Sequence, residues 1–326
     1  MAVYRPNPSL LEVQLRSIQD QTCADWICHI GIDGTDNLTA ALLRELIGDD
    51  TRFVIHEYSD NVGFYLNFER LLNEVDSATS WIALSDQDDY WYTEKLAVLV
   101  AALDANDVQA VCGQARIAKP DGSSSGVSVR REVRLESLIL NNQATGSLMV
   151  FRGELLNDVL PFPEPTSTAF HDHWIGVCAL ARGRLPQLPQ VVQDYVQHDH
   201  NVIGEAQAES IGTRVQRAAQ AGGGLSRMIG YIRDERWGWR VRMSQRLLRL
   251  DPRSAQSFVR ATAERGLNAT ILFHLVGAAI RRELPASRAI SLMTGAASWR
   301  IHKFKTDRLS SRSKPAERND TKRGTA

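Results

Sequence analysis

Short apolar runs alternate with amphipathic segments through the first third of the chain, and this alternation limits the fold more than any other feature. The runs WICHIGI, RFVIHE, SWIAL and VQAVCG have the length and composition of buried strands. Between them, apolar residues recur at helical spacing. Strands that alternate with helices predict an α/β domain whose mixed, mostly parallel sheet is covered on both faces. The predicted strands occupy residues 26–32, 52–57, 80–84 and 108–113.

Polar residues mark where the predicted helices begin. Asn7 can cap a helix over 7–22, and Asp36 can cap the next one, at about 38–47. Thr93 is the predicted cap of the helix that follows SDQDDYW. Each of these side chains has an oxygen that can accept a hydrogen bond from an unpaired amide of the first helical turn.

Three carboxylates crowd together directly after the third predicted strand. Residues 85–91 read SDQDDYW, so Asp86, Asp88 and Asp89 fall within four positions. Each like-charged neighbour raises the free energy of keeping all three ionised. The stretch alone is open to two interpretations, a solvated acidic turn or a site that binds a cation. Asp33 also follows a predicted strand, and ligands bind at the carboxyl ends of strands in such sheets, so the two acidic turns together favour a site at that edge.

The charge of the chain is balanced overall but divided between its two parts. From Glu205 to the end the sequence holds 24 Lys and Arg against 10 Asp and Glu, whereas the residues before it hold 14 against 28. An acidic N-terminal part suits a divalent cation, and a basic C-terminal part suits phosphates, an anionic membrane surface or an acidic partner. We expect no nucleic acid partner, because the basic part carries no nucleic-acid-binding motif and the other part is acidic.

The sequence has the features of a cytoplasmic protein. Its cysteines form no CxxC pair and predict neither a zinc knuckle nor a disulfide framework. No charged segment followed by an apolar one marks a signal peptide. The most apolar late run, ATILFHLVGAAI at 269–280, is shorter than the ~20 residues that span a bilayer. We expect it to form a core helix, with attachment to a membrane surface left open. The four cysteines are Cys23, Cys28, Cys112 and Cys178.

These patterns divide the chain into three parts. Residues 1–204 are expected to form the α/β domain, 205–300 a basic helical extension, and 301–326 a polar, disordered tail. The extension contains an Arg-rich helical stretch, 233–249, that also carries two tryptophans. This stretch is either a helical cap that packs on the α/β domain or a surface that docks on anionic lipid head groups. Its arginines and tryptophans are Arg233, Arg236, Arg240, Arg242, Arg246, Arg249, Trp237 and Trp239.

Several short motifs occur in one order along residues 1–204: QLRSIQDQT, IGIDGTDN, NVGFYLNFERLL, SDQDDYWYTEKL, ATGSLMVF, HDHW and YVQHDHN. This set resembles the pattern of glycosyltransferase family 2, in the subgroup that contains bacterial rhamnosyltransferases. DQDDxW with a downstream HDxW and QHxxN is specific as a set, whereas each fragment alone is weak. The resemblance implies a glycosyltransferase-A fold, a Rossmann-like α/β domain that binds a nucleotide-sugar, here followed by the helical C-terminal extension.

The resemblance assigns residues to the donor side of the site. SDQDD matches the family's DxD element, so Asp86 and Asp88 would hold Mn²⁺ or Mg²⁺, which bridges the diphosphate and stabilises the leaving group. IGIDGTDN matches the turn in which Asp33 would accept a hydrogen bond from the imide of uracil or thymine. Ile32 stands where the family commonly has another Asp. The remaining expected contacts to the nucleotide-sugar are Val3, Tyr4, Asn61, Gly63, Asn67, Asp86 and Gln87.

HDHW matches the position of the family's catalytic base. Asp172 would remove the proton of the acceptor hydroxyl while the sugar carbon is attacked from the face opposite the nucleotide. Its place at a helix start predicts a lowered pKa, because the helix dipole favours the ionised carboxylate; a helix cap is its alternative role. In YVQHDHN, His198 is a further candidate ligand of metal or diphosphate, and Val196 replaces an Arg that is common there. The expected contacts on the acceptor side are Thr145, Gly146, His171 and Trp174.

The resemblance implies an inverting, metal-dependent glycosyltransferase. Its donor would be a dTDP- or UDP-sugar, with dTDP-rhamnose the best single choice, and its acceptor a glycan or lipid-linked glycan of O-antigen or another surface polysaccharide. It would act in the cytoplasm, free or attached to the inner face of the plasma membrane through its basic C-terminal part. Two alternatives stay open: a binding module without activity, suggested by the altered IGIDGTDN turn, and a metal-dependent hydrolase, suggested by HDH at 171–173 and 198–200.

The first strand of the family's sheet is nearly missing from this sequence. The chain opens with MAVYRPN, in which Val3 and Tyr4 match only the end of that strand. The strand is central in this fold, so its loss would leave neighbouring backbone groups without partners. We therefore hypothesise that translation begins upstream of Met1; the in-frame sequence before that codon tests this.

Overall fold

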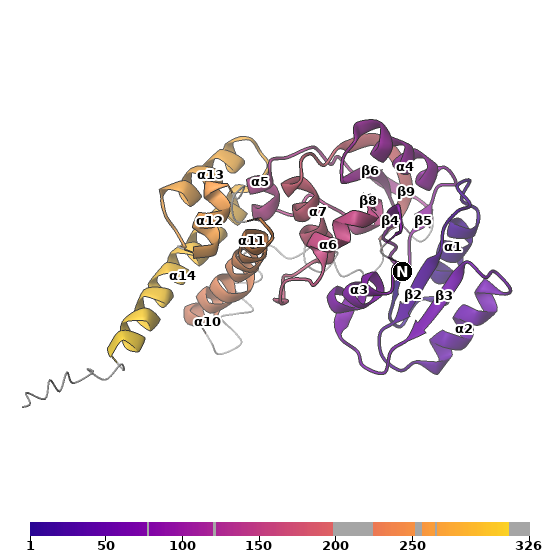
Figure 1. Ribbon diagram of the computed structural model, residues 1–326, viewed down its shortest axis with the longest axis horizontal. Coiled ribbons are helices and arrows are strands. Elements are labelled where there is room, and N and C mark those ends of the chain that lie inside the picture. Colours follow the sequence, from indigo (N-terminus) through magenta and orange to yellow (C-terminus); the bar gives the residue numbers. More distant parts are fainter. Residues whose placement is uncertain (77, 120–121, 198–223, 252–255, 265, 313–326) are drawn as a thin grey trace, which may run out of the picture.

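Two sheets with their helices form one end of the molecule, and the C-terminal helices form the other end (Figure 1). The computed structural model describes residues 1–76, 78–119, 122–197, 224–251, 256–264 and 266–312. The expected boundary at residue 204 and the tail beyond Arg312 lie outside the described residues.

The N-terminal sheet has three parallel strands in the order β1-β2-β3. Its parallel register aligns the carboxyl ends of all three strands, with Val3 opposite Ile32. In β2 the side chains alternate: Ile30 packs in the cluster formed with α1 and α2, whereas Gly31 faces α3, where a Cβ would lie 3.0 Å from Asn67. The elements of this sheet are β1 (Ala2–Val3), α1 (Pro8–Gln19), β2 (Cys28–Ile32), α2 (Asn37–Ile47), β3 (Phe53–Glu57) and α3 (Gly63–Asn73).

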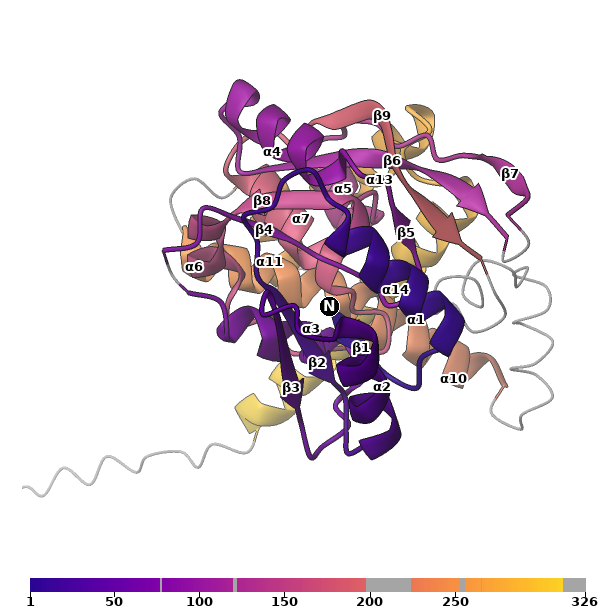
Figure 2. The ribbon, with the colours of Figure 1, turned by 90° about the vertical axis from the view of Figure 1, so that its right-hand side faces the viewer.

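The second sheet is mixed and follows the order β4-β8-β6-β9-β5, with β7 paired to β6. Among its pairings in the described residues, β6–β9 is parallel and the others are antiparallel. Figure 2 shows the two sheets one above the other, with the N terminus between them. The elements are β4 (Trp81–Ala83), β5 (Tyr90–Trp91), α4 (Lys95–Asn106), β6 (Ala110–Ala118), β7 (Ser124–Val127), α5 (Leu135–Leu140), β8 (Met149–Arg152), α6 (Leu156–Val159), α7 (His171–Ala181) and β9 (Gln187–Val196).

The α/β prediction is confirmed, and the parallel part of the architecture is smaller than expected. The mixed character arises because the chain returns through α5 and a 3₁₀ turn directly into β8, which runs against both β4 and β6. Antiparallel strands need no long crossover, so these connections can be short. β7 and β9 were not predicted, since β7 is a short polar hairpin strand and β9 carries polar residues at its centre.

The helix caps agree with the sequence in two places and differ in one. Asn7 accepts hydrogen bonds from two backbone amides of the first turn of α1, and Asp36 accepts one from the amide of Thr39. The prediction for Thr93 is wrong, because no side chain caps α4. The carbonyl of Thr93 instead accepts the amide of Thr22 at 3.0 Å, which ties the loop before α4 to the end of α1.

The C-terminal helices share one hydrophobic core with the α/β part. A continuous cluster of buried side chains joins α3, α5 and α7 to α11, α12 and α13, and both Trp237 and Trp239 are fully buried in it. The C-terminal part is therefore packed on the helix that begins with HDHW. Its elements are α10 (Gly224–Tyr231), a π-helical turn (Ile232–Trp237), α11 (Gly238–Leu250), α12 (Ser257–Glu264), α13 (Ala269–Ile280) and α14 (Ala286–Arg312).

Three arginines of the 233–249 stretch reach across to the α/β part. Their guanidinium groups donate charge-assisted hydrogen bonds to backbone carbonyl oxygens. This supports the interpretation of the stretch as a packed helical cap. The pairs are Arg240 with Leu140 at 3.1 Å, Arg242 with Pro165 at 2.6 Å and Arg246 with Leu160 at 2.8 Å.

The expectation of a disordered tail from residue 301 is wrong as far as Arg312. α14 continues to that residue. Its first half is anchored by the buried side chains of Leu292 and Ala296. A helix that is already nucleated extends readily through Lys, Arg and Leu, which are good helix formers.

Trp239→Phe should lower the free energy of unfolding by about 1–3 kcal/mol. The indole N–H of Trp239 donates to Nδ1 of His173 at 3.1 Å. The other ring nitrogen of His173, Nε2, lies 2.7 Å from the carbonyl oxygen of Leu138. His173 therefore links α5, α7 and α11. The substitution leaves the buried Nδ1 without its donor. Urea unfolding followed by circular dichroism measures the change. Tyr231→Phe, at an exposed position of α10, is the control, and an unshifted midpoint for Trp239→Phe would contradict the assignment.

Candidate functional site

The acidic loop leaves the carboxyl end of β4 and lies at the edge of the second sheet. Leu84 and Ser85 are buried directly after the strand, and Asp86 and Asp88 are half-buried beyond them. Asp89 is only 1% exposed. The cluster is therefore not a solvated turn, because its carboxylates are partly or fully withdrawn from water.

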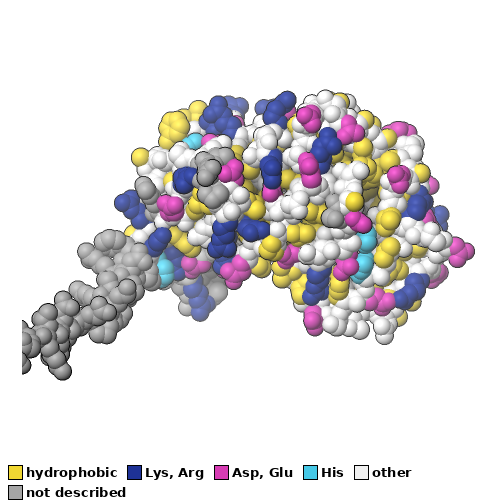
Figure 3. Space-filling view, viewed as in Figure 1, with side chains coloured by type: hydrophobic (Ala, Val, Ile, Leu, Met, Phe, Trp, Pro, Cys, Tyr) yellow, Lys and Arg dark blue, Asp and Glu magenta, His cyan; other side chains and the backbone are white. Residues whose placement is uncertain are grey.

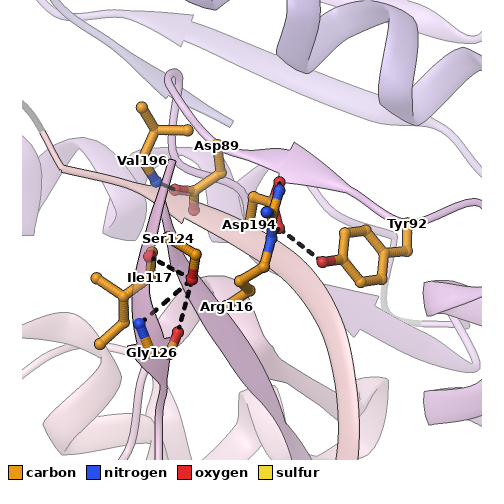
Figure 4. A network of polar contacts seen from close by, with 8 residues as sticks. All are labelled: Asp89, Tyr92, Arg116, Ile117, Ser124, Gly126, Asp194 and Val196. Carbon is orange, nitrogen blue, oxygen red and sulfur yellow. Dashed lines mark hydrogen bonds and ion pairs between the residues drawn. The ribbon is translucent and has the colours of Figure 1, made fainter. Parts of the chain in front are cut away.

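Asp89 holds the loop in place. One of its oxygens accepts a hydrogen bond from Nε2 of Gln193 at 2.8 Å. The other accepts one from the amide of Val196 at 3.4 Å, so Asp89 binds the loop to β9 (Figure 4). With both oxygens turned toward β9, Asp89 serves the structure of the loop. Val196 contributes its backbone amide to this contact.

A buried lysine lies beneath the acidic loop and was not predicted from the sequence. Lys95 is 1% exposed. Its ammonium group donates to the carbonyl of Ser147 at 2.6 Å and to the side-chain oxygen of Gln193. The ammonium nitrogen also lies 3.5 Å from the centre of the Trp91 ring. Burial lowers the pKa of Lys95, whereas the charges of Asp89 and Asp86 oppose that shift. The only sequence signal was one lysine at the start of an otherwise apolar helix, KLAVLVAAL.

Asp86 is electrostatically unfavourable as a bare carboxylate. Burial, followed by the negative charges of Asp88 and Asp172, raises the pKa of Asp86 to about 7. The charges of one carboxylate on the same loop and of one on α7 thus both act on Asp86. A positive charge placed among them would relieve this repulsion.

Asp172 lies in the first turn of α7, and its two oxygens have fixed partners. Oδ1 accepts Nδ2 of Asn142 at 2.9 Å, and Oδ2 accepts the amide of Gly146 at 3.2 Å. Burial raises the pKa of Asp172, so the expectation that the helix dipole lowers it is wrong: desolvation outweighs the dipole and both hydrogen bonds. Asn142 was not singled out from the sequence, because the motif match began two residues later at ATGS.

Other predicted acceptor-side residues divide between the site and the core. His171 stacks on Phe68 with 3.8 Å between ring centroids, and its Nδ1 has no hydrogen-bond partner among the described residues. Burial lowers the pKa of His171 to about 3, so the ring is neutral. Gly146 is required beside it, since a Cβ there would lie 2.7 Å from its Nε2. Thr145, next to Gly146, is half-buried.

Trp174 is not placed where an acceptor can reach it. Its side chain is fully buried, and its indole N–H donates to the carbonyl of Val159 at 2.8 Å. His173 also points into the core, and burial lowers its pKa to about 3. The α-helix turns these two residues away from the edge that carries His171 and Asp172, because successive residues are separated by about 100° around the axis.

The predicted nucleotide residues gather at the carboxyl ends of β1 and β2. Asp33 is buried, and its two oxygens accept the amides of Val62 and Gly63, both at 2.8 Å. Asn61 donates to the carbonyl of Asp33 at 3.4 Å, so this side chain fixes the loop before α3. Gly63 has a φ of +79°, which favours glycine.

Asn67 packs beneath the same loop. It is buried and donates to the carbonyl of Gly31 at 2.9 Å. The residue therefore holds α3 against β2, away from the open edge of the sheet. Beside that edge lies a hollow of about 180 Å³, lined by Ile32, Gly34, Thr35, Asp36, Glu57, Tyr58 and Ser59.

Gln87 connects the acidic loop to the first strand. The amide of Tyr4 donates to Oε1 of Gln87 at 2.9 Å, and Nε2 of Gln87 donates back to the carbonyl of Tyr4 at 3.2 Å. Val3 is buried and continues the β1–β2 ladder through its carbonyl, which accepts the amide of Asp33. Hydrogen bonds thus join the end of β1 to the Asp33 turn and to the acidic loop.

Strand β9 supplies a second polar network next to the loop. Arg116 donates through Nε to Asp194 at 2.7 Å, and the hydroxyl of Tyr92 donates to the same carboxylate at 2.6 Å (Figure 4). The network joins β6, β9 and the segment after β5. His198 and the second HDH sequence, 198–200, lie outside the described residues.

The carboxylates fit a divalent cation that is shared with a phosphorylated ligand. No group of three or more His, Cys, Asp or Glu within the described parts of the chain is arranged as a complete metal site. Asp86 and Asp88 provide two hard oxygen donors, and Mg²⁺ commonly takes one or two carboxylates and completes its shell with water and substrate phosphates. Within the HDH sequence at 171–173, His173 is not available as a ligand, because both of its ring nitrogens are used in the core.

Comparison with known proteins gives a family match for the N-terminal part of the chain. Residues 1–154 match the family model described as glycosyl transferase family 2, slightly less than half of the chain. No curated protein matches the chain in sequence.

Solved structures share the fold at low sequence identity. S. aureus TarS 1-349 in complex with UDP-GlcNAc is 13% identical, with 93% of this chain and 91% of that chain covered and a TM-score of 0.52. The same protein in complex with UDP is 15% identical over 86% and 90%, with a TM-score of 0.51. The mannosyltransferase PcManGT from Pyrobaculum calidifontis, in complex with GDP-Man and Mn²⁺, is 18% identical over 93% and 84%, with a TM-score of 0.48. The domain match and the shared fold support a glycosyltransferase with a mixed α/β domain and a helical C-terminal region.

Asp86→Asn should raise the melting temperature of the cation-free protein at about pH 8 by roughly 2–4 °C for each kcal/mol of repulsion that it removes. The folded pKa of about 7 lies above the ordinary value of 3.8, so ionisation of Asp86 opposes folding. This penalty is present above the folded pKa and disappears as the pH falls toward the ordinary value.

Thermal unfolding in the presence of a chelator, at about pH 8 and about pH 5, measures this difference. The gain should shrink at the lower pH, where the wild-type carboxyl is protonated. Asp107→Asn, at an exposed position that already has a left-handed backbone, is the control. A variant that melts below wild type at both pH values would show that Asp86 is not under repulsion.

Proposed function

We propose that this protein is an inverting, metal-dependent glycosyltransferase that moves a sugar from a nucleotide-sugar to a glycan acceptor. The observation that carries the proposal is the electrostatic state of Asp86: burial, followed by the charges of Asp88 and Asp172, raises the pKa of Asp86 to about 7. A site that concentrates negative charge at the edge of a sheet suits a cation with a diphosphate. The third carboxylate, from α7, is available as a base.

The donor would lie along the edge from the hollow beside β2 to the acidic loop. The nucleobase would occupy the hollow, and Asp33, Asn61 and Gly63 would shape its wall by holding the loop before α3. Both oxygens of Asp33 already accept a hydrogen bond from a backbone amide. Each oxygen has a second lone pair, which could accept a hydrogen bond from the imide N–H of the base. The proposed donor side also includes Gln87 and the backbone near Val3 and Tyr4. The side chain of Asn67 lies deeper on the same side.

Asp86 and Asp88 would hold Mn²⁺ or Mg²⁺. When bound, the cation would neutralise charge on the departing nucleoside diphosphate. The protein's own contribution is to keep the two carboxylates at the edge: Asp89 fixes the loop to β9, and Lys95 places a buried positive charge below it. His198 stays a candidate ligand of the same cation.

Asp172 would act as the general base. The acceptor hydroxyl would lose its proton to a carboxylate oxygen of Asp172 while its own oxygen attacks the anomeric carbon from the face opposite the diphosphate, which inverts that centre. Asn142 and the Gly146 amide orient the carboxylate, and the raised pKa makes it a stronger base than a solvated Asp. Neutral His171 and half-buried Thr145 would border the acceptor.

The identity of the sugar rests on the motif resemblance. dTDP-rhamnose is the proposed donor, and a uridine donor is the alternative, since TarS was solved with UDP-GlcNAc and with UDP. The proposed acceptor is a glycan or lipid-linked glycan in the synthesis of O-antigen or another surface polysaccharide, on the cytoplasmic side of the membrane. Calorimetric titration of dTDP and UDP in the presence of Mn²⁺ separates the two nucleotides.

Asp172→Asn should lower kcat for sugar transfer by about 10²–10⁴-fold and leave donor affinity nearly unchanged. Asn keeps the size of the side chain but cannot accept the proton. The assay measures release of dTDP or UDP from the nucleotide-sugar with Mn²⁺ and acceptor, and calorimetry measures donor binding. Asp107→Asn is again the control. Normal turnover by Asp172→Asn would refute its role as base.

The same assay separates the two rival functions. A binding module without activity would bind the donor but release no nucleoside diphosphate with any acceptor. A metal-dependent hydrolase would release it equally fast with and without acceptor, whereas a transferase releases it slowly until acceptor is added. No release in any condition, or release independent of acceptor, would overturn the proposed function.

A further inference from the structure

The helix α13 is apolar on the side that faces water as well as on the side that faces the core. Ile271, Leu275 and Ala278 are buried against the neighbouring helices. The remaining large apolar side chains of this helix are exposed. A helix that is hydrophobic all round is normally buried all round, so this one has a face without a partner in the described part of the chain. The exposed side chains are Leu272, Phe273, Val276 and Ile280, which are 43%, 74%, 45% and 76% exposed.

These four residues form one stripe, which we call the α13 stripe. At about 100° per residue they fall within one arc of about 100°, opposite the three buried positions. The stripe is about 12 Å long, at 1.5 Å per residue from Leu272 to Ile280. Figure 3 shows hydrophobic side chains gathered on the surface at the α13 end of the molecule, with dark blue basic side chains next to them.

Basic side chains follow the stripe directly along the chain. The segment 269–280 contains no Asp, Glu, Lys or Arg, and it leads directly into the exposed Arg281 and Arg282. Glu283 pairs with Arg281 at 2.9 Å, whereas Glu136 lies 4.0 Å from His274, whose pKa is lowered by burial. Over the described residues from Gly224 to Lys303, thirteen Lys and Arg stand against five Asp and Glu.

We propose that the α13 stripe docks the protein on an anionic lipid surface. Apolar side chains that include Phe and Leu, bordered by arginines, are the composition of helices that lie in the interface of a membrane without crossing it. No helix within the described residues is both long and apolar enough to span a bilayer. The stripe is also small for a dimer contact, because ~12 Å by the ~10 Å width of a helix falls far below the ~800 Å² that each partner buries in a stable interface.

This surface differs from the one suggested by the arginine content of 233–249. Three of those arginines donate to backbone carbonyls inside the molecule and are not directed at a membrane. The docking face is instead the end of the molecule that is remote from β1–β3 (Figure 1). Docking there is independent of the proposed reaction, and it would hold the protein beside an acceptor carried by a lipid.

Vesicle flotation tests the proposal with the full chain. Vesicles of phosphatidylcholine mixed with phosphatidylglycerol should carry the wild-type protein upward, and vesicles of phosphatidylcholine alone should carry much less. Phe273→Gln combined with Ile280→Gln should reduce flotation on the anionic vesicles by at least about tenfold, since it replaces the two most exposed apolar side chains. Arg282→Gln should reduce it by about fivefold, and added salt should reduce the wild type similarly.

Ile27→Gln is the matched control, because Ile27 is an isoleucine that is 67% exposed. It lies just before β2, at the end of the molecule opposite α13 (Figure 1). Far-ultraviolet circular dichroism and nucleoside diphosphate release without vesicles confirm that each variant is folded. Wild-type flotation by the Phe273/Ile280 double variant, or no flotation of the wild type on anionic vesicles, would overturn the proposal. So would a dimer in analytical ultracentrifugation that the double variant abolishes, since a second copy would then cover the stripe. Loss of docking with retained turnover would leave the proposed reaction intact.

Discussion

The buried contact between the acidic loop and β9 is the interaction on which the site depends. Asp89 accepts hydrogen bonds from Gln193 and from the amide of Val196, and Lys95 donates to Gln193 and to the carbonyl of Ser147. One charged network therefore joins the loop after β4, the helix α4, the turn before β8 and the strand β9. Removing one member would leave an unpaired charge or amide in the interior, which is strongly destabilising. The network fixes the loop that carries Asp86 and Asp88.

The C-terminal helices appear in this arrangement as a support for α7. The first turn of α7 presents His171 and Asp172 to the site, and the next two residues are locked inside: His173 between Leu138 and Trp239, and Trp174 against Val159. Because α11 supplies Trp239, the position of the proposed base depends on a helix more than sixty residues further along the chain. The hydrogen bonds of His173 and Trp174 hold the first turn of α7 in place, despite the repulsion between the carboxylates at this edge.

Local patterns in the sequence predicted the local structure well. The caps Asn7 and Asp36 and the strands β2 and β3 follow from spacing and side-chain chemistry within a few residues. The two acidic turns were expected at one edge of one sheet, but Asp33 follows a strand of the first sheet and Asp86 a strand of the second. The environment of the site could not be predicted in the same way. Lys95 and Gln193 meet across 98 residues, and no short-range signal marks that pairing.

The pKa of Asp172 shows a second limit of reasoning from sequence. A helix start favours an ionised carboxylate, and this local effect is readable from HDHW. Burial acts in the opposite direction and is larger, but it depends on the packing of α5 and α7 against the C-terminal helices. Likewise, the period of a helix shows that Asp172 and Trp174 differ in direction, whereas only the fold decides which of them faces the site.

We propose that Asp86 and Asp88 carry a divalent cation together with the diphosphate of a nucleotide. Electron paramagnetic resonance of Mn²⁺, titrated into the protein with and without dTDP or UDP, measures this binding. We expect weak binding of Mn²⁺ alone, tighter binding when the nucleoside diphosphate is present, and loss of both in Asp88→Asn with an unchanged circular dichroism spectrum. Equal Mn²⁺ binding by wild type and Asp88→Asn, or no binding by the wild type with either nucleotide, would contradict it.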